Sequence, residues 1–213
     1  MKIGIILNGE IDDYKNTKKI MLDEKYDCII CSDGGANHTY EMDITPNYIL
    51  GDLDSIDPDR IDYYKEAGVS FKKFPSKKDE TDTELCIYLA KTLGADQVDF
   101  YGALGGRIDH TLANVKLLYY TKEEGIYSRI LSTKEDMYLI EDSEMVLHGN
   151  KGDTISVVAT KGDAEGVTLL DLEYPLDRYF MKFSKPIGIS NVMLKDTCRI
   201  KVEKGCVFVI RNK

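Results

Sequence analysis

The feature that most constrains this chain is a change in its hydrophobic pattern near residue 133. Before that point, short apolar runs alternate with segments of helical period, which is typical of strand and helix units that build a parallel sheet. After it, apolar runs of period two are separated by glycine-containing turns, as in antiparallel sheets. We therefore expect an α/β domain with a mainly parallel sheet over residues 1–133, followed by an all-β, sandwich-like domain over residues 134–213.

The N-terminal pattern can be divided into individual elements. Thr81 and Glu84 have the spacing of a capping box, which predicts that a helix begins there. A second helix is expected over residues 109–120. The expected strands lie at residues 3–7, 28–31, 48–50, 70–74, 97–101 and 129–131.

Composition argues against several classes of protein. The 213 residues carry 28 basic and 37 acidic side chains, and the net charge of −9 argues against sequence-independent binding of nucleic acid. No segment approaches the run of about 18 apolar residues that a membrane-spanning helix needs. The first apolar run, at residues 3–7, is too short for a signal-peptide core, so we expect a cytoplasmic protein.

Five cysteines are present, and only Cys28 and Cys31 are closely spaced. Both fall in an expected strand, where side chains three positions apart point to opposite faces. This position favours buried thiols in a reducing compartment over a redox or zinc-binding pair.

Acidic residues follow the expected strands directly. Asp33 follows the second strand, Asp52 and Asp54 follow the third, and Asp79 and Asp82 follow the fourth. Because the carboxyl ends of parallel strands share one edge of a sheet, we expect these side chains to converge on one crevice.

Asp52 and Asp54 occupy alternate positions, so in an extended segment both carboxylates would project to one side while Leu53 turns toward the core. Such a pair can chelate Mg²⁺, which binds one or two protein carboxylates together with water and substrate phosphates. The alternative is an Asx turn that leads into a helix, with Asp57 as N-cap and Pro58 at the first position.

Two further loops have the composition of an anion or cation site. Asp82 can simply complement the dipole of the helix that begins beside it, whereas Asp79 lies outside that helix and is the better candidate ligand. The segment GALGGRIDH at 102–110 contains three glycines, which let backbone amides approach an anion. Its Arg107 carries a guanidinium group that suits phosphate oxygens. The sequence contains neither a Walker A loop nor a GxGxxG motif after the first strand.

As a set, SDGGAN at 32–37, GDLDS at 51–55, DETD at 79–82 and GGRIDH at 105–110 resemble the motifs of the thiamine pyrophosphokinases. In addition, EYPLD at 173–177 and GISN at 188–191 are similar to segments of that family's thiamine-binding β domain, so the resemblance covers nearly the whole chain. It implies an enzyme that transfers the pyrophosphoryl group of ATP to the hydroxyl group of thiamine, giving thiamine diphosphate and AMP.

The resemblance also implies roles for individual residues of the first domain. Asp52, Asp54 and Asp79 would hold Mg²⁺. Asp54, Asp79 and Arg107 would take part in catalysis, with Arg107 stabilising charge on the transferred group. The residues that would line the nucleotide and phosphate site are Asp33, Thr81, Asp82, Arg107 and Asp109.

In the second domain, the resemblance implies that Ser190 and Asn191 contact thiamine. The chain contains no tryptophan, so aromatic stacking on thiamine must come from tyrosine or phenylalanine, with Tyr179, Phe180 and Phe183 as candidates. The resemblance further implies a homodimer in which the β domain of one subunit completes the nucleotide site of the other.

Two other functions are compatible with parts of the sequence. DLDSI at 52–56 approximates the DxDx(T/V) motif of haloacid dehalogenase phosphatases, but in that family the motif follows the first strand and here it follows the third. A non-catalytic sensor of nucleotide and metal would use the same ligands without turnover. Incubation with ATP and thiamine separates the three, because only a pyrophosphokinase releases AMP and only a phosphatase releases free phosphate.

Overall fold

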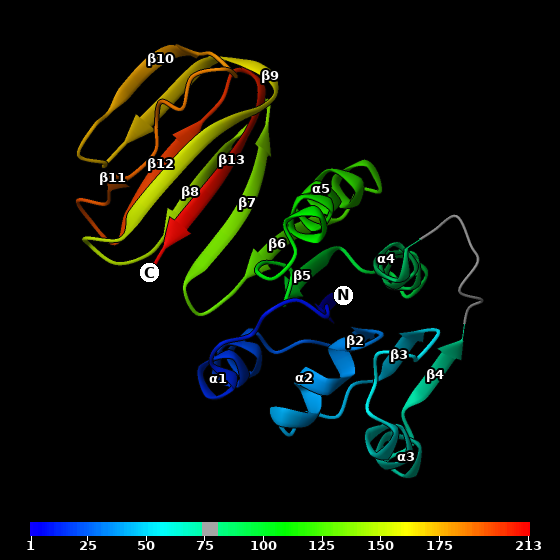
Figure 1. The fold of residues 1–213 in the computed structure, drawn as a ribbon. Coiled ribbons are helices and arrows are strands. Elements are labelled where there is room, and N and C mark those ends of the chain that lie inside the picture. The colour runs from blue at the N-terminus through cyan, green and yellow to red at the C-terminus, as the bar shows by residue number, and fades with distance from the viewer. Residues whose placement is uncertain (74–80) are drawn as a thin grey trace. The chain divides into compact units, whose positions relative to one another are not determined.

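The computed structural model describes residues 1–73 and 81–213. The chain divides into two compact units, Met1–Thr133 and Lys134–Lys213 (Figure 1). Within the described ranges, no helix combines the length and the apolar character needed to cross a membrane.

The N-terminal unit contains a sheet whose strand order is β4-β3-β2-β1-β5-β6. Each pair of neighbours is parallel, which confirms the expected parallel sheet. The central strands are mostly apolar, as expected for strands that are buried on both faces of a sheet. The strands are β1 (Lys2–Ile6), β2 (Cys28–Ser32), β3 (Tyr48–Gly51), β4 (Ser70–Lys73), β5 (Gln97–Tyr101) and β6 (Tyr127–Leu131).

Helices connect these strands, as the crossovers of a parallel sheet require (Figure 1). They are α1 (Tyr14–Glu24), α2 (Gly35–Glu41), α3 (Pro58–Glu66), α4 (Asp82–Thr92) and α5 (Ile108–Glu123). The capping box is confirmed, because Oγ1 of Thr81 accepts from the Glu84 N–H at 3.2 Å and the Glu84 carboxylate accepts from the Thr81 N–H at 2.7 Å. Asp57 is the N-cap of α3, with Pro58 as its first residue.

A charged side chain of β5 lies inside this unit. Asp99 of β5 is fully buried, and its carboxylate accepts from Nε of Arg129 at 2.7 Å and from Oη of Tyr26 at 2.8 Å. This pairing offsets the cost of removing the carboxylate from water. The five cysteines of the chain are buried thiols, as the strand position of Cys28 and Cys31 predicts.

The C-terminal unit is antiparallel throughout. Its strand order is β7-β13-β9-β12-β8, and β10 and β11 also pair with β9. The strands are β7 (Glu135–Glu141), β8 (Glu144–His148), β9 (Thr154–Leu170), β10 (Leu176–Met181), β11 (Asn191–Val192), β12 (Thr197–Lys201) and β13 (Lys204–Asn212).

The long strand β9 changes partners along its length. Residues 154–160 pair with β13, whereas residues 168–170 pair with β12. Gly162, with φ of 127°, lies between the two halves and permits the change of direction. Val157 from the first half and Leu169 from the second belong to the same buried apolar cluster, which gives the unit its expected sandwich-like core.

Candidate functional site

Three carboxylates from separate loops meet at the carboxyl ends of the parallel strands. Asp33 follows β2, Asp52 follows β3, and Asp82 begins α4. One oxygen from each carboxylate can be chosen so that all three lie within 4.8 Å of one another. The convergence expected for this edge of the sheet is therefore found for Asp33, Asp52 and Asp82.

Backbone geometry brings these residues together. Asp33 has a left-handed φ of 45°, and its N–H donates to the Leu50 carbonyl at 2.7 Å. Gly51 has φ of 143°, and a Cβ atom there would lie 2.9 Å from Cβ of Asp33. Only glycine therefore fits where β3 passes Asp33. The third carboxylate is positioned by α4, because the capping box at Thr81 fixes the first turn of this helix and with it Asp82.

The electrostatics of the cluster favour a cation. Oδ1 of Asp33 is buried and accepts no hydrogen bond from the residues that the structure describes. Burial raises the pKa of Asp33 above its usual value, the nearby Ser55 side chain opposes this, and the negative charges of Asp52, Asp54 and Asp82 raise it further. A hard divalent cation with oxygen ligands would reverse that repulsion and supply the missing partner, so these residues fit such an ion.

Asp54 is placed differently from Asp52. Leu53 has φ of 71°, so the chain turns at this point instead of continuing as an extended segment, although Leu53 does pack on the core as predicted. Asp54 is exposed, and its carboxylate accepts from Oγ of Ser55 at 3.0 Å. Asp79 lies outside the described residues. Asp82, which the resemblance places at the nucleotide site, also has its carboxylate in the three-carboxylate cluster.

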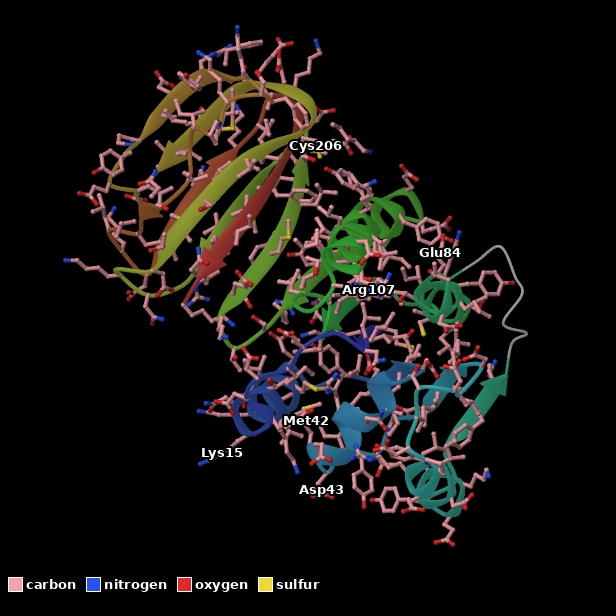
Figure 2. The ribbon with its side chains drawn as sticks, viewed as in Figure 1. Lys15, Met42, Asp43, Glu84, Arg107 and Cys206 are labelled. Carbon is pink, nitrogen blue, oxygen red and sulfur yellow. The ribbon has the colours of Figure 1, made fainter. Side chains whose placement is uncertain are left out.

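Arg107 lies at the N-terminal end of α5, after the glycine-rich turn (Figure 2). Its Nε and Nη2 atoms donate to the two oxygens of Asp109 at 3.1 and 2.6 Å. This hydrogen bonding lowers the pKa of Asp109 to about 2. Both side chains are exposed, so the guanidinium is held in a defined orientation and remains accessible.

The loop after β1 is a neighbour of this turn that sequence reasoning missed. The Gly9 N–H donates to the Gly102 carbonyl at 2.8 Å, and a Cβ atom on Gly105 would lie 2.6 Å from a carboxylate oxygen of Glu10. The available signal was a polar, glycine-containing segment at residues 8–10, directly after the first apolar run. This segment therefore packs against the glycine-rich turn that precedes Arg107.

His38 of α2 supports the same loop. Nε2 lies 2.7 Å from the Gly9 carbonyl oxygen, and Nδ1 lies 2.9 Å from Oη of Tyr14. Burial lowers the pKa of His38 below its ordinary value of 6.5, although the hydrogen bond to Gly9 opposes this. The neutral ring therefore donates from Nε2 to Gly9 and accepts from Tyr14 at Nδ1.

In the C-terminal unit, the expected thiamine-contacting residues differ in exposure. Ser190 is exposed and has φ of 55°. Asn191 is only 3% exposed, and its carboxamide is hydrogen-bonded to the backbone of Tyr174. Tyr174 itself is 65% exposed. The three aromatic candidates named from the sequence are also exposed, namely Tyr179, Phe180 and Phe183.

Comparison with known families decides between the functions compatible with this arrangement. The model of the thiamin pyrophosphokinase catalytic domain matches residues 21–129, and that of the vitamin B1 binding domain matches residues 138–207. The chain belongs to the thiamine pyrophosphokinase family. Members of this family are enzymes that act on ATP and thiamine.

Individual thiamine pyrophosphokinases agree with this assignment. The enzyme of Bacillus subtilis is 25% identical over 181 residues, covering 84% of this chain and 85% of that protein. Thiamine pyrophosphokinase 1 of Oryza sativa subsp. japonica is 25% identical over 206 residues, covering 85% and 77%. The crystal structure of the B. subtilis enzyme has a TM-score of 0.88 at 25% identity and covers 100% of this chain and 99% of its own. These matches support neither the phosphatase nor the sensor.

The pKa of His38 leads to a prediction about stability. Because the pKa of His38 is lower in the folded state, the unfolded chain binds a proton at this residue more readily than the folded chain does. The contribution of neutral His38 to the unfolding free energy is therefore complete above pH 6.5 and is lost as the pH falls through the folded-state pKa. We expect His38→Gln to flatten the dependence of the unfolding free energy on pH between about 7.5 and 5.5. Urea denaturation at several pH values measures this slope.

The matched control is His148→Gln, which makes the same substitution at an exposed histidine of the other unit. An unchanged slope in the His38 variant would contradict the neutral, buried assignment.

Proposed function

We propose that this chain transfers the pyrophosphoryl group of ATP to the hydroxyl group of thiamine, with Mg²⁺ as cofactor. In this reaction the thiamine hydroxyl group releases its proton to solvent, its oxygen bonds to the β-phosphorus, the bond from that phosphorus to the α-phosphate bridging oxygen breaks, and AMP leaves. Membership of the family supports the reaction. The observation that supports Mg²⁺ as cofactor is the close group of three carboxylates. Its Asp33 Oδ1 atom is buried and has no hydrogen-bond partner among the described residues.

The proposed ligands of Mg²⁺ are Asp52 and Asp82, together with Asp33. Asp54 and Asp79, which the resemblance implies as ligands, remain part of the proposal, Asp54 because it lies two positions from Asp52. When bound, the cation would neutralise charge on the phosphate oxygens of ATP. That neutralisation is needed because a chain of net charge −9 otherwise repels a polyanionic substrate.

Arg107 is proposed to bind the phosphates and to stabilise charge on the transferred group. Its accessible guanidinium and the two preceding glycines with positive φ support this role, because the turn leaves room for a close approach. Asp109 orients the guanidinium. Thr81 is proposed to line the same site, although its hydroxyl group already serves the capping box.

The C-terminal unit is proposed to bind thiamine. Ser190 is exposed, and Tyr174 presents an exposed aromatic ring beside the same segment. A tyrosine ring face attracts cations, and the thiazolium ring of thiamine is cationic. We therefore add Tyr174 to the aromatic candidates Tyr179, Phe180 and Phe183.

We further propose a cytoplasmic homodimer whose nucleotide and thiamine sites are shared between subunits. The exposed apolar side chains of the C-terminal unit support a partner surface there, and they include Ile187, Ile189 and Leu194. Five buried cysteine thiols are compatible with a reducing compartment.

The first prediction of this proposal concerns the reaction products and the dependence of turnover on Mg²⁺. With ATP, thiamine and Mg²⁺, AMP and thiamine diphosphate should appear in equal amounts, and thiamine monophosphate should not accumulate. Asp52→Asn, Asp54→Asn and Asp82→Asn should each lower turnover and raise the half-saturating Mg²⁺ concentration by about tenfold or more, because each removes a carboxylate charge.

Asp59→Asn serves as the control, since Asp59 is exposed on α3 outside the cluster. ADP as the main product would refute attack at the β-phosphorus. Wild-type Mg²⁺ dependence in the Asp52 and Asp82 variants would refute the cation assignment.

The second prediction concerns the shared site. Asp82→Asn and Tyr174→Ala should each be strongly impaired when Mg²⁺ is kept well below the half-saturating concentration of the Asp82 variant and thiamine well below the KM of the Tyr174 variant. After subunit exchange in equal amounts, about half of the dimers are mixed and each carries one intact site, so roughly a quarter of wild-type activity should return. Mass measurement verifies the exchange. A fully exchanged mixture whose activity does not rise would exclude shared sites.

A further inference from the structure

We propose that Asn191 is a positioning residue, which fixes Tyr174 for thiamine recognition without contacting thiamine itself. This inference rests on the proposed thiamine site of the C-terminal unit and assigns a role to one residue within it. It differs from the role implied by the sequence motif, in which Asn191 touches the ligand directly.

The first observation is that the Asn191 carboxamide is already occupied. Its Oδ1 atom accepts from the N–H groups of Tyr174 and Val192, both at 2.9 Å, and its Nδ2 atom donates to the Tyr174 carbonyl at 2.7 Å. A carboxamide oxygen has two acceptor positions, and both are used here. Because the residue is 3% exposed, little of the group can reach a ligand.

The second observation is the place of these bonds in the backbone. The segment before Tyr174 pairs with the segment around Asn191, since the Glu173 N–H donates to the Val192 carbonyl at 2.9 Å and the Leu194 N–H donates to the Asp171 carbonyl at 3.0 Å. Proline follows at position 175 and has no N–H group to continue such pairing. The Asn191 side chain therefore acts as the last backbone partner and fixes both polar groups of Tyr174.

The third observation is the contrast between the backbone of Tyr174 and its ring. The Tyr174 backbone is held on both its donor and its acceptor side, yet its ring is 65% exposed. Holding an exposed aromatic residue in place reduces the conformational entropy that binding would otherwise cost. Asn191 thus contributes to affinity by ordering the residue that presents the ring.

A double-mutant cycle on the KM for thiamine tests this inference. Asn191→Ala should raise that KM about tenfold and leave the KM for ATP within about twofold of wild type. In a Tyr174→Ala background, the same Asn191 change should alter the thiamine KM by less than about twofold, because the ring it positions is gone. Asn191→Asp should also raise the thiamine KM, since its carboxylate keeps the two acceptor bonds but places a buried acceptor oxygen against the Tyr174 carbonyl in place of the donor bond.

A second readout needs no turnover. The chain contains 14 tyrosines and no tryptophan, so Tyr174→Trp introduces a single tryptophan whose emission can be excited separately from that of tyrosine. Its steady-state anisotropy without substrate should fall when Asn191→Ala is added, and thiamine should change its emission. Asp142→Ala is the matched control, because it removes a side-chain bond to the Gly205 N–H, at 2.7 Å, in another turn of the same unit. It should leave both the anisotropy and the thiamine KM as they were.

Two results would overturn the inference. Equal increases in thiamine KM from the Asn191 change with and without the Tyr174 ring would mean that Asn191 acts independently of Tyr174. An unchanged thiamine KM in Tyr174→Ala would remove the ring from the thiamine site, and continued formation of AMP and thiamine diphosphate would then show that the proposed reaction stands without it.

Discussion

Repulsion among three carboxylates at one edge of a parallel sheet is the constraint on which the site depends. Oxygens of Asp33, Asp52 and Asp82 lie within 4.8 Å of one another although they follow three different strands. Two unit charges at about 4 Å repel by about 1 kcal/mol in water and by about 4 kcal/mol near a protein surface. A cation that removes this repulsion binds the folded chain and not the unfolded one, so ligand binding and stability of the N-terminal unit become linked.

Interactions of the backbone hold these carboxylates close together. Gly51 lets β3 pass close to Asp33, and the Thr81 capping box fixes the first turn of α4. On the other side of the same sheet edge, His38 holds Gly9 and so supports the loop beside the glycine-rich turn before Arg107. Each support acts through a main-chain atom, which defines loop positions better than contacts between exposed side chains would.

The sequence allowed the strands of the N-terminal unit to be placed, because buried parallel strands are continuous apolar runs. It did not reveal which strands pair, since an apolar run carries no information about its neighbours. Within the site, the position of Asp52 after β3 could be predicted, but the turn at Leu53, which ends the extended segment before Asp54, could not. In the same way, the GISN motif marks Asn191 as important without indicating that its side chain points inward.

The central claim is that Asp33, Asp52 and Asp82 form one cation site. The most direct measurement is a crystal structure grown with Mn²⁺ in place of Mg²⁺, with an anomalous difference map recorded at the manganese absorption edge. We expect a single strong peak among the three carboxylates, with ligand oxygens at about 2 Å. A map with no peak there at saturating Mn²⁺, or a strong peak coordinated by other residues only, would contradict this account.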